Sequence, residues 1–186
     1  INASLSTNWD DFREALRDYE WTNNFAYADR QGNIGVQMSM ALPNRVEVND
    51  WRGQRPARGW LGEGAWDGLI PFEQQPFVFN PDKGWIADSN GRAIDDRFGL
   101  RIGEQFSPPW RASRAYELFA AREKHNMQSV RNVQLDATSA GTRWLLQTLR
   151  TFEMTSERNT QAMTMLDGWD GEYTRERGEP VLYSAW

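Results

Sequence analysis

The chain has 186 residues, 39% of them hydrophobic, and a formal net charge of −5, which is enough for one domain with its own core. This composition disfavours disorder, the negative charge argues against a nucleic-acid surface, and no run approaches the roughly 20 apolar residues of a membrane helix. Cysteine is absent, which excludes disulfides and thiolate chemistry.

The beginning of the chain predicts a helix followed by a hairpin. Residues 6–21 (STNWDDFREALRDYEW) carry apolar side chains at helical spacing, and Thr7 with Asp10 predicts a capping box. Residues 23–40 contain two β-rich runs around a turn at 29–33, which is typical of a β-hairpin.

The middle of the chain predicts loops and short extended pieces. Residues 43–68 show little periodicity, and a loop of this length is usually functional or wraps a neighbour. Residues 69–91 return to short extended pieces separated by proline. They end in Asn90-Gly91, a pair that tolerates positive φ and therefore predicts a tight turn. On these residues alone, Asn90 either only turns the chain or also presents its side-chain amide.

The second half of the chain is predicted to be helical. Helical spacing, a proline start and glycine turns indicate helices in residues 108–125, 126–152 (one or two helices), 156–171 and 179–186. The last of these stops in mid-pattern. We therefore predict an α+β fold with a strand and loop part at 1–107, including the N-terminal helix, and a helical part at 108–186 that is truncated at its C-terminus.

Few side chains suggest catalysis by themselves. His125 is the only histidine, which rules out a His-based metal cluster, and a solvated or capping role at a helix end is the commoner one. A glycosidase would need two carboxylates across a cleft, and the loop candidates are Asp67, Asp88, Asp95, Asp96 and Glu104. Loop aspartates are more often turn formers.

The chain also has 10 tryptophans, and most of them stand beside Gly, Asp or Pro rather than in helical stripes. Such side chains either plug a core or line a cleft. One alternative function is therefore a non-catalytic carbohydrate-binding or interaction module, with a stacking platform built from Trp51, Trp60, Trp66 and Trp85.

Five segments in a fixed order resemble a known family. They are NFAYADRQGNIG, GAWDGLIPFEQQPFVFNPDKGWIADSNGR, MQSVRNVQLDATS, DGWDG and EPVLYSAW. Together they are similar to the β-subunits of penicillin acylases, cephalosporin acylases and acyl-homoserine-lactone acylases, and the likeness covers nearly the whole chain. The resemblance implies a fragment of an αββα N-terminal-nucleophile hydrolase that cleaves an acyl-amide bond, such as a β-lactam side chain or an acyl-homoserine lactone.

In that family a precursor cleaves itself and exposes a serine whose own α-amine acts as the base. The resemblance implies that Asn90 donates a hydrogen bond to the oxyanion and that Arg114 supports the site, with Arg111 as the neighbouring match. Two positions depart from the family pattern. Gly91 stands where a second Asn is common and lets the backbone aim Asn90, and Asp88 adds a carboxylate that Arg92 or Arg114 would neutralise.

The resemblance also implies partners. No residue near Ile1 matches the nucleophile, so the chain resembles an internal piece that works with the α-subunit and the remainder of the β-subunit and is inactive alone. The substrate would be a small acyl-amide whose acyl chain and leaving group the sequence does not specify. No cofactor is required; a structural Ca²⁺ would take the Pro43 carbonyl as a ligand, with Glu104 as the nearest carboxylate. Relatives are typically exported, which implies a periplasmic or extracellular location.

Overall fold

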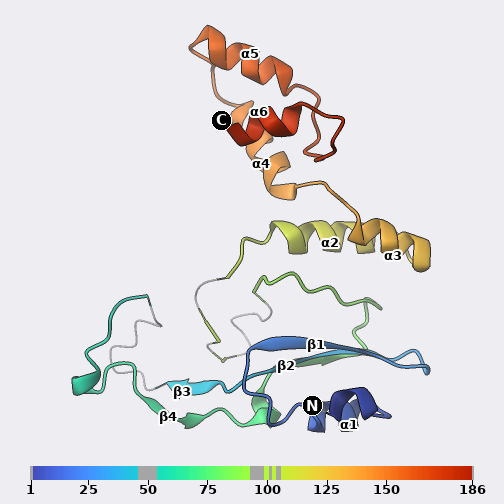
Figure 1. Cartoon of the computed structure of the whole chain (residues 1–186), viewed down its shortest axis with the longest axis vertical. Helices are drawn as coiled ribbons and strands as arrows, with labels where there is room; N and C mark the ends of the chain where they lie inside the picture. The colour runs from blue at the N-terminus through green and yellow to red at the C-terminus, as the bar shows by residue number, and fades with distance from the viewer. Residues whose placement is uncertain (1, 46–53, 93–98, 101, 104–105, 186) are drawn as a thin grey trace. The chain divides into compact units, whose positions relative to one another are not determined.

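The computed structural model describes residues 2–45, 54–92, 99–100, 102–103 and 106–185 (Figure 1). The chain forms two compact units. The first, which we call the strand unit, comprises residues 1–88 and 92–107, and the second, the helical unit, comprises 89–91 and 108–186. The strands lie in the first half of the chain and the longer helices in the second, which confirms the predicted mixed α+β composition.

The strand unit begins with a short helix whose cap lies one residue later than predicted. After the 3₁₀ turn η1 (Asn2–Leu5), helix α1 runs over Trp9–Glu14. Asn8 is the N-cap, and its Oδ1 accepts a hydrogen bond from the Asp11 backbone N–H at 2.9 Å. The predicted Thr7–Asp10 capping box is therefore wrong, because Asn8 is the better placed of two adjacent residues that can both cap.

The predicted hairpin is confirmed. Strands β1 (Asn23–Ala28) and β2 (Ile34–Ser39) pair antiparallel, and β5 (Phe77–Phe79) adds to the other side of β2. The turn is organised by Asp29, whose Oδ1 accepts hydrogen bonds from the backbone N–H groups of Gln31 and Asn33, each at 2.9 Å. This pattern is an Asx-type turn, in which a short side chain replaces a backbone acceptor.

Helix α1 packs its apolar side chains on one face of this sheet. Trp9, Phe12, Leu16 and Phe72 form the buried cluster, and Leu16 has no solvent-exposed surface. The ring of Trp9 stacks on Phe79 with centroids 5.0 Å apart and meets Tyr27 edge-on at 5.4 Å. Such aromatic pairs add to the stabilisation that burial of the rings provides.

Two buried glutamines hold the segments around β2 together. The carboxamide of Gln75 accepts a hydrogen bond from the Met40 N–H at 3.2 Å and donates one to the Met40 carbonyl at 2.8 Å. Gln37 accepts a hydrogen bond from Nε of Arg13 in α1 at 2.8 Å. Because a buried amide without partners would cost free energy, these bonds fix the register of the segments they join.

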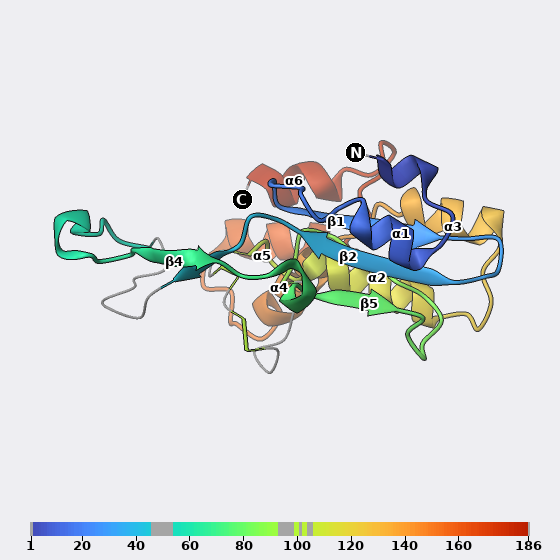
Figure 2. The ribbon, with the colours of Figure 1, turned by 90° about the horizontal axis from the view of Figure 1, so that it is seen from below.

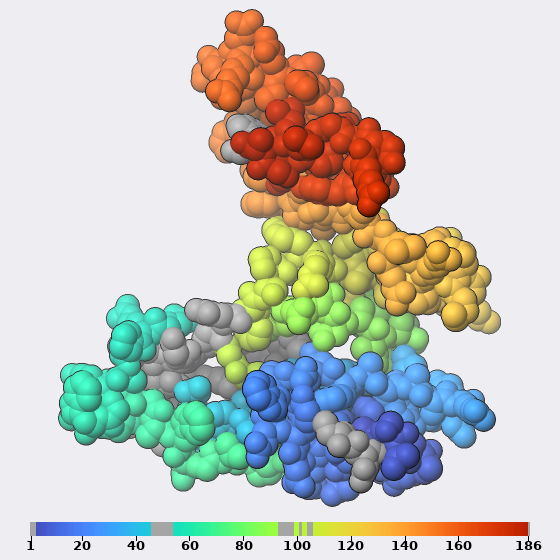
Figure 3. All heavy atoms as spheres, in the orientation of Figure 1, coloured from blue at the N-terminus to red at the C-terminus, as the bar shows by residue number. Residues whose placement is uncertain are grey.

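A second, two-stranded sheet lies within the stretch that was predicted as a long loop. Strand β3 (Pro43–Arg45) pairs antiparallel with β4 (Trp66–Leu69), and this ribbon extends away from the first sheet (Figure 2). The connection contains the 3₁₀ turn η2 (Gly59–Leu61), and η3 (Phe72–Gln74) follows β4. Residues 54–69 form a projection from the strand unit, seen in teal and green in Figure 3.

The helical unit contains five helices among its described residues. They are α2 (Trp110–Ala120), α3 (Met127–Gln134), α4 (Ala140–Leu149), α5 (Glu157–Met165) and α6 (Glu179–Ala185). Serine and asparagine side chains cap three of them: Asn126, Ser139 and Ser156 each accept a hydrogen bond from a first-turn N–H. Leu146, Leu166 and Trp169 form the buried cluster of this unit.

Neither unit contains, among its described residues, a helix that is both long and apolar enough to cross a lipid bilayer.

The contact of Trp9 with Gly35 gives a first test of the strand unit. A Cβ added at Gly35 would lie 2.6 Å from Cζ3 of Trp9, so Gly35→Ala must displace the indole ring. We expect the free energy of unfolding to fall by about 1–3 kcal/mol, measured by urea denaturation. Gly59→Ala is the matched control, because its Cβ meets no atom within 4 Å. Equal stability of the two variants would contradict this packing.

The Asp29 turn gives a prediction on pH. The pKa of Asp29 is lowered, chiefly by the hydrogen bond from the Asn33 side chain and further by the backbone N–H groups and the Tyr27 hydroxyl. A lowered folded-state pKa stabilises the fold above the unfolded pKa of about 3.9, and this contribution is lost as the pH falls through the folded value. Asp29→Asn should therefore be less stable than wild type at neutral pH, with a difference that shrinks on acidification. A constant difference across a pH series of urea unfolding curves would contradict the assignment.

Candidate functional site

Asn90 and Arg111 form the contact on which the candidate site rests. Asn90 has φ of 55° and is exposed, which confirms the predicted turn. Arg111, the second residue of α2, donates from one Nη2 to Oδ1 of Asn90 at 2.8 Å and to the Ser89 carbonyl at 3.1 Å. A guanidinium group can only donate, so the atom that faces it must be the amide oxygen. The amide nitrogen of Asn90 is then the end that can donate to another group.

This orientation has a chemical consequence. The positive charge of Arg111 lies on the carbonyl side of the amide and draws electron density toward the oxygen. The N–H groups at the other end therefore become better hydrogen-bond donors. A donor of this kind, fixed before the reaction, is suited to an oxygen atom that gains negative charge.

The role expected for Gly91 is corrected by the backbone angles. Asn90 itself carries the positive φ, whereas Gly91 is not in the left-handed region. A Cβ at Gly91 would meet only Cβ of Ala112, at an ordinary contact distance of 3.8 Å. The turn therefore uses the tolerance of asparagine for the left-handed conformation and does not need a glycine after it.

Arg114 lies one turn further along α2 and has different partners. Its Nη2 and Nε donate to the two carboxylate oxygens of Asp136 at 2.7 and 3.0 Å, and its Nη1 lies 2.7 Å from Glu117. Both members of the Arg114–Asp136 pair are largely buried, with 15% and 16% of their side chains exposed. The guanidinium lowers the pKa of the Asp136 carboxyl, and the Thr138 N–H lowers it further. The structure thus brings Asn90 together with Arg111, while Arg114 joins α2 to the end of α3.

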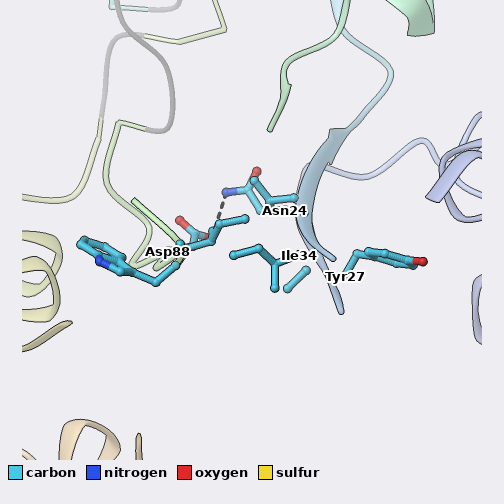
Figure 4. Close-up of a pocket in the computed structure, with 10 residues that line it drawn as sticks. Asn24, Tyr27, Ile34 and Asp88 are labelled. Carbon is cyan, nitrogen blue, oxygen red and sulfur yellow. Dashed lines mark hydrogen bonds between the residues drawn. The ribbon is translucent and has the colours of Figure 1, made fainter. Parts of the chain in front are cut away.

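Asp88 lies in the strand unit and lines a cavity of about 300 Å³. Its Oδ2 accepts a hydrogen bond from Nδ2 of Asn24 in β1 at 2.9 Å, and the two side chains point toward one another in Figure 4. The side chain of Tyr27 points away from the cavity, toward Trp9 and Phe12. The cavity is lined mainly by the sheet and the segment before Asp88, with Asn24, Ala26, Ile34, Val36, Trp85 and Ile86 among its residues.

Asp88 and Arg114 lie in different units, so the expected neutralisation of Asp88 by Arg114 stays a prediction; within its own unit, Arg114 contacts Asp136 and Glu117. The alternative, Arg92, has its guanidinium 5.7 Å from the Phe106 ring centroid. Sequence reasoning missed Asn24 as the partner. The only available sign was strand alternation, which places Asn24 on the face of β1 opposite to Phe25.

The other candidate residues that the structure describes have separate surroundings. His125 contacts the Phe119 carbonyl at 3.0 Å and the Ser129 hydroxyl at 3.2 Å, so it connects α2 and α3. Trp60 in η2 and Trp66 in β4 are exposed, and Nζ of Lys83 lies 4.1 Å from the ring of Trp85. Asp67 is exposed on β4. Four further candidates lie outside the described residues: Trp51, Asp95, Asp96 and Glu104. The Trp platform and the paired carboxylates stay predictions.

The expected calcium site rests on the Pro43 carbonyl and on Glu104. Pro43 is the first residue of β3, opposite Leu69 in β4. Within the described ranges, no group of three or more His, Asp or Glu side chains is placed to hold an ion. Since Glu104 lies outside these ranges, the role of the Pro43 carbonyl also stays a prediction.

The sequence matches the penicillin amidase family over residues 1–186, and the chain belongs to this family. Acyl-homoserine lactone acylase QuiP of Pseudomonas syringae pv. tomato is 30% identical over 176 residues, which are 87% of this chain and 21% of that protein. Penicillin acylase 2 proenzyme of a Pseudomonas species (strain SE83) is 28% identical and is matched over 88% of this chain and 21% of its own length. The E. coli penicillin G acylase is 40% identical over 89 residues, 48% of this chain and 10% of that protein.

A solved structure shows the same fold. The thermostable penicillin G acylase from Alcaligenes faecalis superposes with a TM-score of 0.76 at 23% identity, over 100% of this chain and 35% of that chain. This chain thus spans about a fifth or less of the curated relatives named here.

The partners of Arg114 predict a role in stability. Asp136→Asn removes the charge that Arg114 neutralises, and we expect a loss of about 1–3 kcal/mol in the free energy of unfolding. The control is Glu117→Gln, which changes an ion pair of the same arginine on a side chain that is 53% exposed and should cost less than about 1 kcal/mol. Indistinguishable urea unfolding curves for the two variants would contradict the structural role.

Proposed function

We propose that this chain is the part of an acyl-amide hydrolase that supplies Asn90 as a hydrogen-bond donor to the oxyanion of the tetrahedral intermediate. The observation that carries the proposal is the bond from Arg111 to Oδ1 of Asn90, in a segment that resembles the family pattern. That bond leaves the amide nitrogen as the free donating end of the side chain.

The proposed mechanism follows from where charge develops. When a nucleophile attacks the carbonyl carbon of an amide, the carbonyl oxygen becomes negative. Asn90 would meet this oxygen through Nδ2, and Arg111 would keep the amide from rotating away. Because the donor is already oriented, little reorganisation is needed as the charge forms.

The nucleophile in this proposal is an N-terminal serine released by self-cleavage, which another segment of the same precursor carries. Its own α-amine would accept the proton during attack, so no histidine and no cofactor are required. This agrees with the contacts of His125, which are to Phe119 and Ser129. The partners are then an α-subunit and the remainder of the β-subunit, and the location is periplasmic or extracellular.

We assign the supporting role to Arg111 in place of Arg114. Arg111 contacts the proposed donor directly, whereas the contacts of Arg114 are to two carboxylates of the helical unit. Arg111→Ala should therefore lower kcat, and Arg114→Ala should act mainly on stability.

The substrate class comes from the chemistry that the named relatives share. Acyl-homoserine lactones and penicillins both contain a linear amide between an acyl group and an amine. We propose such an amide as the substrate, without a choice between the homoserine lactone and the penicillin nucleus as the amine that is released.

The test separates the turn from the donor. In the intact protein, Asn90→Gly keeps the positive φ but removes the amide, and we expect kcat to fall by about 10² or more. Asn80→Gly is the matched control, because Asn80 is also left-handed with φ of 46° but bonds to the Ile34 N–H and the Asn33 side chain. It should lower stability without a comparable fall in kcat.

The proposed donor role of Asn90 is overturned if the Asn90→Gly protein matures normally and retains its kcat, since Asn90 would then be a turn residue only. The 186-residue chain alone is expected to show no hydrolysis of acyl-amide substrates. Activity in that preparation would contradict the proposal that another segment supplies the nucleophile.

A further inference from the structure

The pair Asn90-Gly91 has a chemistry of its own. It is the only Asn-Gly pair in the sequence; every other asparagine is followed by a residue with a side chain. Asn90 is exposed, and Gly91 leaves the approach to its backbone nitrogen open, because glycine has no Cβ. Among the hydrogen bonds of the described residues, the Gly91 N–H donates to no acceptor.

We propose that Asn90 is a site of spontaneous deamidation in the native chain. The Gly91 nitrogen loses its proton to solvent base and attacks Cγ of Asn90, forming a C–N bond and a tetrahedral centre. The bond from Cγ to Nδ2 then breaks, and ammonia leaves with a proton from solvent. Water opens the resulting five-membered imide at either carbonyl and leaves an aspartate or an isoaspartate at position 90. Nothing is oxidised or reduced.

The contact with Arg111 favours this step. As the Gly91 nitrogen attacks, Oδ1 of Asn90 gains negative charge, and the Arg111 guanidinium lies 2.8 Å from that oxygen. A fixed cation beside a developing oxyanion lowers the free energy of the charged intermediate. The leaving nitrogen is at the opposite end of the amide.

Two other asparagines show why the site is selective. Both ends of the Asn33 amide are held, since Nδ2 donates to Asp29 and Oδ1 accepts from Asn80. Asn80 is left-handed like Asn90 but precedes Pro81, whose nitrogen has no proton to lose. Neither combines a free next N–H with a cation on the amide oxygen.

The consequence for activity rests on the proposed function. Deamidation replaces the donating NH₂ of Asn90 with a carboxylate oxygen, which cannot donate and repels an oxyanion. Arg111 would then neutralise a charge instead of orienting a donor. Deamidation of Asn90 would therefore inactivate the enzyme gradually, as the oxyanion donor is lost.

The experiment follows position 90 by peptide mass mapping of the full 186-residue chain, incubated folded in mildly alkaline buffer. Trypsin releases residues 84–92, GWIADSNGR, in which Asn90 is the only asparagine. We expect this peptide to gain the mass that replacement of NH₂ by OH adds, and to divide into aspartate and isoaspartate forms. Peptide 132–143, in which Asn132 precedes Val133, is the internal control and should stay unchanged.

Gly91→Ala is the matched variant, because its Cβ fits at 3.8 Å from Ala112 and Gly91 does not need positive φ. It should slow the mass gain by at least about tenfold without loss of stability. An unchanged amide at position 90 in wild type, or equal rates in the two proteins, would overturn the proposal. If position 90 deamidates while the intact enzyme keeps its full activity, the modification stands and the proposed role of Asn90 fails.

Discussion

The strand unit depends on one aromatic ring. Trp9 lies between helix α1 and the sheet, where it contacts strands β1 and β5 and lies against the bare backbone of Gly35 in β2. This close approach is possible only because Gly35 has no side chain. All three strands of the first sheet therefore contact the same ring, and two of them form the hairpin that carries Asn24 and Ile34 of the cavity.

In the helical unit, two arginines of helix α2 contact different partners. Arg111 is near the start of α2 and reaches Asn90, while Arg114 is one turn later and reaches Asp136. A spacing of three residues places both on the same side of a helix, so the sequence offers no way to choose between them. The choice depends on a carboxylate 22 residues after Arg114, a contact that only the folded chain reveals.

Local patterns predicted the elements better than the contacts between them. Alternation and a glycine-containing turn were enough for the hairpin, and the Asn90 turn followed from the chemistry of one residue pair. The β3–β4 ribbon was missed because strands of three and four residues are too short to show alternation. The Asn24–Asp88 bond joins residues 64 apart, and no local propensity encodes such a pair.

The carboxamide of Gln75 has a consequence for how this chain meets other chains. Strand β5 begins at Phe77, but the edge of β2 that it pairs with continues further. Along this edge the Met38 N–H donates to the Pro76 carbonyl, and the N–H and C=O of Met40 both bond to the Gln75 side chain. The side chain of Gln75 thus satisfies the backbone groups of Met40, which β5 does not reach. Open strand edges are templates for aggregation, and a glutamine that occupies both backbone groups of Met40 closes this one to a foreign strand.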